Sequence, residues 1–259
     1  MPAVDVRHPA LPDLFDPDGP NGPLLFGILE GRLPGRAIAD DPVEPRVAAV
    51  QGIEGVAFVS RTTSQTAFKA ALTVLRRDAI VGLVWPIGPD DAEGPVTPEP
   101  PARVMERLGF DPIPASDARF EALRATLPDG VTVRPIDAAL LARCEWRELV
   151  EGAHGSAEAF LEHGLGLCLL RDDEILAEAY APFIGRGVAE VGVVTAEAHR
   201  GRGLAVTAIA WLAIPLVERD LAMYWSCDSD NEASIRVAGK LGFGPARPFE
   251  IRLYRQLEA

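Results

Sequence analysis

Residues 189–205 read AEVGVVTAEAHRGRGLA, and this stretch decides the fold. Its first part is an apolar run that predicts a strand, and its last part opens a long helix near Gly203. The first amides of such a helix have no partner within the helix and carry partial positive charge, which suits a pyrophosphate. Gly201 and Gly203 would let a phosphate approach the backbone, and Arg200 and Arg202 add positive charge. A glycine-rich surface cap with two solvated arginines is the alternative.

Two common phosphate-binding motifs are excluded by the same stretch. Neither Gly-Lys-Ser nor Gly-Lys-Thr follows the glycines, so a Walker-type loop is excluded. A dinucleotide fingerprint requires Gly or Ala three residues after Gly203, and this chain has Val206 there. The sequence therefore predicts a phosphate-bearing ligand of another kind.

Outward from this stretch, the hydrophobic pattern of the second half alternates between the period of strands and that of helices. Strands are predicted at residues 131–135, 166–171, 175–184, 188–195, 221–227 and 250–256. Helices are predicted at residues 136–150, 157–163, 203–217 and 234–241. The predicted order is β-α-α-β-β-β-α-β-α-β.

The first half of the chain is interrupted by many prolines and glycines. Residues 9–23 read PALPDLFDPDGPNGP, a composition that disfavours regular structure. The cluster Pro128-Asp129-Gly130 predicts a turn, and we place a domain boundary there. Between these segments the pattern predicts strands at 55–60 and 79–85 and helices at 63–78, 99–108 and 116–127.

One short sequence occurs in both halves. Residues 108–112 read LGFDP and residues 241–245 read LGFGP. Each copy is predicted to follow a short helix and to precede a strand, although glycines that end helices are common. Together with the similar order of elements before each copy, this echo indicates a duplicated domain.

Several spaced residues resemble the motifs of the GNAT superfamily of N-acetyltransferases. Val193-x-Thr195 followed by Arg200-x-x-Gly203-x-Ala205 is similar to the acyl-CoA pyrophosphate loop of that superfamily. Downstream, Asn231-x-x-Ser234 and then Leu241-Gly242-Phe243 match its second cofactor-contacting helix. The predicted order of elements agrees with its fold, and the resemblance covers residues 131–259 almost entirely.

The resemblance implies an α+β fold with a mixed, mostly antiparallel central sheet flanked by helices. Trp225-x-Cys227 before Asn231, with Ser234 and Ala238 after it, is similar to the acetyltransferase family that includes zwittermicin-resistance enzymes. That likeness implies a degenerate GNAT-like N-terminal domain over residues 1–128 and a catalytic domain over residues 129–259. The first half has no Arg-x-x-Gly-x-Ala loop after a strand, so a single cofactor site is expected.

The resemblance also implies which residues contact acetyl-CoA, the expected co-substrate. Asn231 and Ser234 would lie near its thiol end, although Asn231 is equally suited to be a helix N-cap. Backbone groups of the predicted strand would bind the pantetheine arm, namely those of Val193, Val194 and Thr195. Backbone amides at the start of the helix would hold the pyrophosphate, namely those of Arg200, Gly201, Arg202, Gly203, Leu204 and Ala205.

Acyl transfer to an amine needs a polarised thioester carbonyl, a neutral amine and a proton for the departing thiolate. The backbone amide of Val194 is expected to polarise the carbonyl. Glu190 lies on the same predicted face of the strand and is the expected base. The alternative for Glu190 is an exposed strand glutamate in an ordinary ion pair.

The proton donor for the thiolate is not identified by the resemblance. Most superfamily members carry a tyrosine seven residues after the asparagine, and this chain has Ala238 there. The candidate replacements are Cys227, Ser226, Tyr224 and Tyr254. Solvent is a further source, because a thiolate is a good leaving group.

The composition excludes some classes of partner. The chain has 259 residues, with 38 acidic and 25 basic side chains and a formal net charge of −13. Nonspecific nucleic-acid binding and attraction to anionic membranes both need clustered positive charge, so neither is expected. A cationic amine would instead be attracted at long range. The expected partner is a small-molecule amine, and a homodimer is the assembly left open.

Targeting and redox signals are absent from the sequence. The first residues contain no basic patch followed by an apolar run, and the longest apolar stretch, 204–217, is shorter than the roughly 20 residues of a membrane span. Three cysteines at irregular spacing predict neither a disulfide framework nor a metal site. We therefore expect a protein of the reducing cytoplasm without a bound metal.

The predicted function is acetyl-CoA-dependent N-acetyl transfer to a primary amine of a small molecule, by direct attack in a ternary complex. Ala238 at the usual acid position leaves open a non-catalytic acyl-CoA sensor or interaction module. The two-part organisation also leaves open a tandem acetyltransferase of thiol-cofactor biosynthesis of the mycothiol kind. The absence of a second cofactor loop counts against that last alternative.

Overall fold

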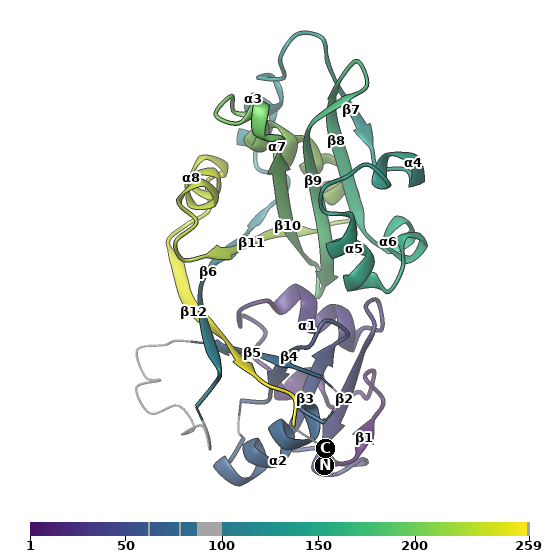
Figure 1. Cartoon of the computed structure of the whole chain (residues 1–259), viewed down its shortest axis with the longest axis vertical. Coiled ribbons are helices and arrows are strands. Elements are labelled where there is room, and N and C mark those ends of the chain that lie inside the picture. The colour runs from purple at the N-terminus through teal and green to yellow at the C-terminus, as the bar shows by residue number, and fades with distance from the viewer. Residues whose placement is uncertain (62, 78, 87–99, 258–259) are drawn as a thin grey trace.

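The strands of the protein form one continuous sheet. The computed structural model describes residues 1–61, 63–77, 79–86 and 100–257. The sheet has twelve strands in the order β1-β2-β3-β4-β5-β12-β6-β11-β10-β9-β8-β7. The molecule is elongated, with the N-terminal half at one end and most of the C-terminal half at the other (Figure 1).

The described part of the N-terminal half contains six strands and four helices. Its strands are β1 (Ala3–Val4), β2 (Gly35–Ala39), β3 (Ala48–Gly52), β4 (Val56–Val59), β5 (Val81–Pro86) and β6 (Arg103–Pro114). Its helices are the 3-10 helix η1 (Pro12–Leu14), α1 (Gly22–Leu29), α2 (Gln65–Leu75) and α3 (Arg119–Arg124). α1 and α2 pack against separate apolar clusters of the sheet.

The C-terminal half contains longer strands. They are β7 (Val131–Pro135), β8 (Leu165–Arg171), β9 (Glu174–Gly185), β10 (Val188–Thr195), β11 (Ala222–Asp228) and β12 (Ala246–Tyr254). Its helices are α4 (Ala138–Leu141), α5 (Arg147–His154), α6 (Ala157–His163), the 3-10 helix η3 (Glu197–His199), α7 (Leu204–Glu218) and α8 (Glu232–Leu241). The largest apolar cluster contains most of α7, and a smaller one lies under α4 and α6.

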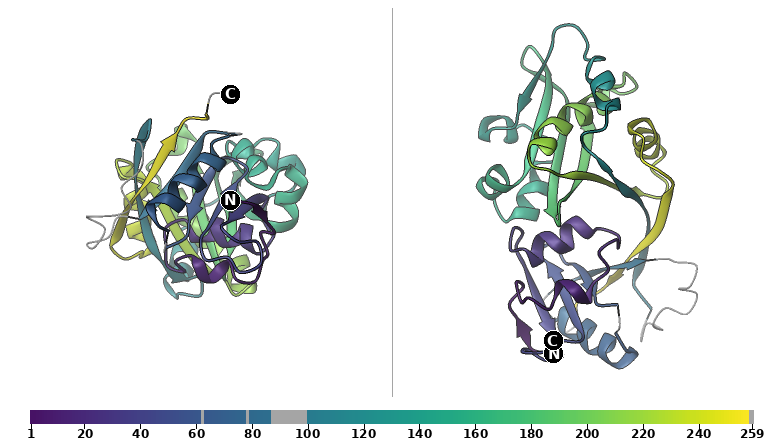
Figure 2. Two further views of the ribbon diagram at one scale, coloured as in Figure 1. Left: turned by 90° about the horizontal axis from the view of Figure 1, so that it is seen from below. Right: turned by 180° about the vertical axis from the view of Figure 1, so that it is seen from behind.

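Two strands connect the halves because each crosses to the other side. β12, from the end of the chain, pairs with β5, whereas β6 pairs with β11. The two crossing strands also pair with each other, so the middle of the sheet reads β5-β12-β6-β11. Seen from behind, they run along one side of the molecule as a twisted ribbon (Figure 2). The two halves therefore share one hydrogen-bonded sheet.

Each half contains the same unit of two parallel strands joined by a helix. The unit is β4-α2-β5 in the N-terminal half and β10-α7-β11 in the C-terminal half. The other strand pairs of the described sheet are antiparallel. The sequence echo does not mark this repetition, because residues 108–112 lie within β6 whereas residues 241–245 connect α8 to β12.

The helix predicted for residues 99–108 is wrong in its described part. Residues 103–114 form β6, and residue 99 lies outside the described residues. The sequence RVMERL has good helix formers, but β6 lies between β11 and β12 and is hydrogen-bonded on both sides. Tertiary pairing outweighs local propensity at this position.

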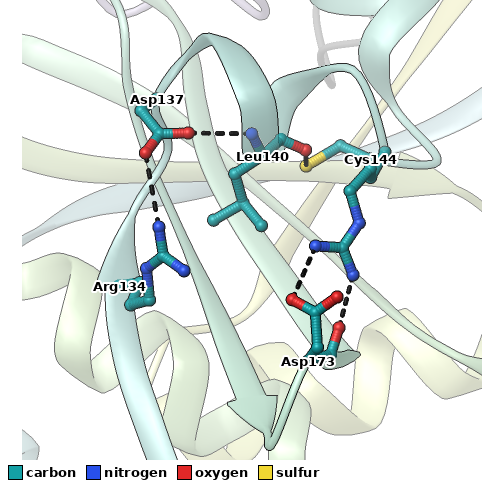
Figure 3. Close-up of polar contacts among 6 residues, drawn as sticks. Arg134, Asp137, Leu140, Cys144 and Asp173 are labelled. Atoms are coloured by element: carbon teal, nitrogen blue, oxygen red, sulfur yellow. Dashed lines mark hydrogen bonds and ion pairs between the residues drawn. The ribbon is translucent and has the colours of Figure 1, made fainter.

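The single helix predicted for residues 136–150 is also wrong, because the first helix, α4, ends at Leu141 and a second helix, α5, begins at Arg147. Asp137 caps α4 by accepting hydrogen bonds from the Leu140 amide and the Arg134 side chain (Figure 3). Arg143 then pairs with Asp173 in the β8–β9 turn and holds the break beside the sheet. The C-terminal half therefore has the order β-α-α-α-β-β-β-α-β-α-β.

The sequence pattern missed α1, β2 and β3, which lie in the region rich in proline and glycine. Every residue of α1 is buried, and Pro23 occupies its first turn, where proline is tolerated. α1 packs directly on the end of β9, since a Cβ at Gly185 would lie 2.3 Å from the Gly27 nitrogen. Glycine at both positions allows this backbone contact.

The remaining predicted strands and helices are confirmed, with ends that shift by a few residues. The predicted domain boundary at residue 128 falls between α3 and β7 and stays a prediction. Phe110 and Phe120, before the boundary, share an apolar cluster with Leu212 of α7. In the described part of the chain, no helix combines the length and hydrophobicity that crossing a membrane requires.

Phe249 on β12 offers a test of the shared sheet. Its side chain is 2% exposed and packs with the α1 cluster of the N-terminal half. Phe249→Ala should lower the free energy of unfolding by about 3–5 kcal/mol, the usual cost of a buried phenylalanine. Chemical denaturation of the variant should show a single unfolding transition with its midpoint at a lower denaturant concentration than in the parent protein.

The matched control is Val43→Ala, because Val43 is 75% exposed. Its free energy of unfolding should stay within about 0.5 kcal/mol of the parent value. Two separate transitions, of which Phe249→Ala moves only one, would contradict a shared sheet.

Candidate active site

The parallel strands β10 and β11 separate after a short paired region. Val188, Ala189 and Glu190 pair with Ala222, Met223 and Tyr224, and no pairing between the two strands follows. β10 continues to Thr195 while paired with β9 on its other side. The edge of β10 that carries Val193, Val194 and Thr195 is therefore not paired with β11. The two strands thus diverge after Glu190. The contact of Val193, Val194 and Thr195 with pantetheine stays a prediction.

The helix that follows β10 begins without a side-chain cap. Gly203 is the N-cap of α7, with φ of +82°, and no side chain bonds to the first turn. Gly201 also has a positive φ of +78°. A Cβ at either glycine would meet no atom within 4 Å, so the space above this loop is open. The uncapped amides and the open space fit a pyrophosphate.

The arginines of this loop contact the loop itself. Arg200 donates a hydrogen bond to the Thr195 carbonyl at 3.2 Å, and Arg202 donates to the Ala198 carbonyl at 3.2 Å. Both side chains belong to exposed residues. His199, beside them, is paired with Glu174 across 2.8 Å. The loop thus carries cations at its surface, and their contact with a phosphate stays a prediction.

Asn231 is confirmed as the N-cap of α8. Its side-chain oxygen accepts a hydrogen bond from the Ser234 amide at 3.0 Å. The Ser234 hydroxyl accepts a hydrogen bond from the Trp225 indole at 3.0 Å. Trp225 is 3% exposed and belongs to the core. The predicted cofactor contacts of Asn231 and Ser234 would have to be made in addition to these bonds.

Glu190 does not form the ordinary ion pair that was its alternative role. The Ser226 hydroxyl donates a hydrogen bond to Glu190 Oε1 at 2.7 Å, and Glu190 Oε2 is buried with no partner among the described residues. Burial raises the pKa of Glu190, while the Ser226 bond and the Arg107 charge lower it in part. A carboxylate with a raised pKa and a free oxygen suits proton transfer near neutral pH.

Arg107 anchors this group and was missed by sequence reasoning. One guanidinium nitrogen donates to the Ser226 hydroxyl at 2.9 Å, and another donates to Asp228 at 2.7 Å. Arg107 therefore orients Ser226 toward Glu190. Arg107 lies on β6, in a segment for which the sequence pattern predicts a helix. For that reason the sequence did not indicate that Arg107 lies in the sheet beside Ser226.

The candidate acids differ in position. Tyr224 is buried, and burial together with the Glu190 charge raises its pKa, which keeps the hydroxyl protonated. Its oxygen accepts a hydrogen bond from the Asn21 amide at 3.2 Å. Burial also raises the pKa of Cys227, which is hydrogen-bonded to Ser234. Tyr254 packs in the α2 cluster of the N-terminal half, away from these residues, which excludes it as the proton donor.

Trp146 covers β10 on the face that carries Glu190. A Cβ at Gly192 would lie 2.3 Å from the Trp146 ring, so only glycine permits this contact. The ring stacks on Tyr180, with centroids 5.6 Å apart. Glu178 accepts a hydrogen bond from the Glu145 amide at 2.7 Å and fixes the segment that leads to Trp146. The break in the predicted helix at 142–146 places this ring, and no sequence pattern indicated that break.

No metal centre accompanies these residues. In the described ranges, no three His, Cys, Asp or Glu side chains are arranged to hold a metal ion. The buried sulfurs of Cys144 and Cys168 lie 3.7 Å apart and are not joined in a disulfide.

The chain is similar to known acetyltransferases. Residues 101–251 match the model of the family described as GNAT acetyltransferase. A curated relative, the uncharacterized N-acetyltransferase YdfB of Bacillus subtilis, is 24% identical over 95% of both chains.

Solved structures share the fold. A GCN5-related N-acetyltransferase-like protein from Streptococcus suis superimposes with a TM-score of 0.66 at 22% identity, over 96% of this chain and 98% of that one. A tandem GNAT protein from the clavulanic acid biosynthesis pathway has a TM-score of 0.55 at 13% identity, over 98% and 94%. The part of the chain that the structure describes therefore adopts a tandem GNAT-like fold.

The start of α7 provides a test of the phosphate site. Gly203→Glu would place a carboxylate over the uncapped amides and should weaken acetyl-CoA binding at least tenfold, about 1.4 kcal/mol. Isothermal titration calorimetry measures the change.

The matched control is Gly187→Glu in the β9–β10 turn. Gly187 has a φ of +72° and the same open surroundings, so the substitution introduces similar backbone strain and the same charge. It should leave acetyl-CoA affinity within about threefold of the parent protein, about 0.6 kcal/mol. Equal affinities for both variants would remove the phosphate site from the loop.

Proposed function

The chain belongs to the GNAT acetyltransferase family, and from that premise we propose that it is an acetyl-CoA-dependent N-acetyltransferase of the cytoplasm. It transfers the acetyl group to a primary amine of a small molecule by direct attack in a ternary complex. The observation that carries the proposal is the divergence of β10 and β11 between the uncapped start of α7 and the buried carboxylate of Glu190. A thioester held between those strands would lie beside a base.

Acetyl-CoA supplies an activated acyl group in this reaction, and the chain supplies the groups around it. Amides from Arg200 to Ala205 hold the pyrophosphate, and the free edge of β10 binds the pantetheine arm. The amide of Val194 donates to the carbonyl oxygen, where negative charge develops during attack. Preorganised donors of this kind need no rearrangement when the charge appears.

Glu190 removes the proton that the amine loses. An ammonium ion has no lone pair for attack, so a proton must leave the nitrogen before or during acyl transfer. The hydrogen bond from Ser226 occupies one carboxylate oxygen and leaves the other for the amine or a bridging water. Arg107 keeps Ser226 in position and is a positioning residue. The thiolate receives its proton from the Tyr224 or Cys227 side chain or from solvent.

A second function is favoured by one observation. Ala238, at the usual position of the acid, is completely buried and has no group that can donate a proton. A chain that binds acyl-CoA without turnover would be a sensor. The assay is release of free CoA from acetyl-CoA with a panel of primary amines. Release on at least one amine supports the enzyme, and tight acetyl-CoA binding without release on any amine supports the sensor.

The role of Glu190 predicts a pH dependence. The base is active only when deprotonated, so kcat/KM should rise with pH through a pKa above the usual carboxyl value. Glu190→Gln should lose at least tenfold in kcat/KM at neutral pH. It should recover toward the parent rate at high pH, where the free amine forms in solution.

Glu106→Gln is the matched control, since Glu106 is exposed and lies beside Arg107 on β6. Its pH–rate profile should follow that of the parent protein. A parent-like profile for Glu190→Gln would exclude Glu190 as the base.

A further inference from the structure

The N-terminal half contains a cavity of about 390 Å³ at the ends of β4 and β5. The volume is within the usual range of small-molecule sites. Four aromatic side chains line it, Phe15, Phe58, Phe68 and Trp85, with apolar Leu25, Val59, Leu83 and Val84. Its polar lining residues are Asp16, Ser60, Arg61 and Thr63.

The cavity occupies the place in the N-terminal half that the proposed thioester site occupies in the C-terminal half. β4 and β5 pair in parallel only at Val56 with Gly82 and Ala57 with Leu83. The cavity lies just beyond that pairing, where ligands of parallel strands are commonly found. The helix that follows is different, because Ser64 caps α2 by accepting a hydrogen bond from the Ala67 amide at 3.3 Å. The cavity beside the start of α2 therefore suits an apolar group rather than a diphosphate.

Two connections join the cavity to the hydrogen-bonded group of Glu190, Ser226 and Arg107, called the Glu190 group below. Gly19 and Pro20 line the cavity, and the next residue, Asn21, donates its amide to the Tyr224 hydroxyl. Tyr224 is the strand partner of Glu190.

The second connection runs across the sheet. Pro86 of the cavity pairs with Phe249, Phe249 pairs with Arg107, and Arg107 pairs with Asp228. Two strand spacings separate Pro86 from Arg107, roughly 10 Å. The Arg107 guanidinium lies over the Phe249 ring, 6.0 Å from its centroid, so both side chains are on one face. The cavity and the Arg107 side chain therefore lie on nearby strands of one sheet, with the Phe249 ring between them.

We propose that this cavity binds the aromatic or bulky apolar body of the acceptor, whose amino group reaches Glu190. The proposal rests on the proposed function and names the substrate class, an amphiphilic amine with its apolar group separated from the nitrogen by a spacer. Carboxylates of Glu190 and Asp228 attract the ammonium end. Aromatic side chains remove the other end from water, which favours binding of apolar surface.

The test uses phenylalkylamines with spacers of increasing length and n-butylamine as the simple amine. The parent protein should acetylate a long-spacer phenylalkylamine with kcat/KM at least tenfold above that of n-butylamine. Val59→Trp fills the cavity from β4. It should remove this preference by raising KM for the phenylalkylamine. The kcat/KM for n-butylamine and the affinity for acetyl-CoA should stay within about threefold.

Val43→Trp is the control, because it adds the same side chain at an exposed site of the same half. Val59→Phe, a smaller increase in volume, replaces Val59→Trp if that variant does not fold. An unchanged preference for phenylalkylamines in a folded Val59 variant would overturn the proposal.

Calorimetric titration with the phenylalkylamine separates this proposal from the proposed function. If no amine is acetylated, the proposed function fails. Binding to the parent protein that the Val59 variants lose would still support the cavity as the site of the apolar group. Equal binding by the parent and the Val59 variants, or no binding to either, would contradict it.

Discussion

After Glu190 and Tyr224, β10 separates from β11, and the proposed acetyl-CoA site requires this separation. While paired, neighbouring strands satisfy each other's backbone groups, and a gap between them leaves donors and acceptors free for another molecule. The gap requires an alternative partner for each strand, and β9 and β6 supply these. β10 therefore has a free edge beyond Glu190, and α7, which follows it, begins without a side-chain cap.

The exchange of β6 and β12 gives the N-terminal half a role in that site. β6 brings Arg107 to the side of Ser226, and Arg107 is the residue that positions Ser226 against Glu190. The segment before α1 brings Asn21 to Tyr224. Because both elements precede the predicted boundary at residue 128, a catalytic domain cut at that point would lack Arg107. In the proposed site, the N-terminal half therefore supplies the contacts of Arg107 with Ser226 and of Asn21 with Tyr224.

Local signals allowed the sequence to predict the C-terminal half well. The Asn231 cap and the period of each strand are properties of short segments, and these features are confirmed. The phosphate contact of the glycines and arginines before α7 stays a prediction. The errors arose where distant segments decide the structure. Residues 103–108 are compatible with a helix, and only the two neighbouring strands make them a strand. The positions of Arg107 and Trp146 depend on such long-range packing. The sequence therefore indicated Glu190 as a candidate but not the residues that orient and cover it.

A crystal structure with coenzyme A bound would test the central claim most directly. We expect the diphosphate on the amides between Arg200 and Ala205, the pantetheine arm along the free edge of β10, and the sulfur between the separated strands near Glu190. Coenzyme A bound elsewhere, or a diphosphate that makes no contact with the start of α7, would contradict this assignment of the site.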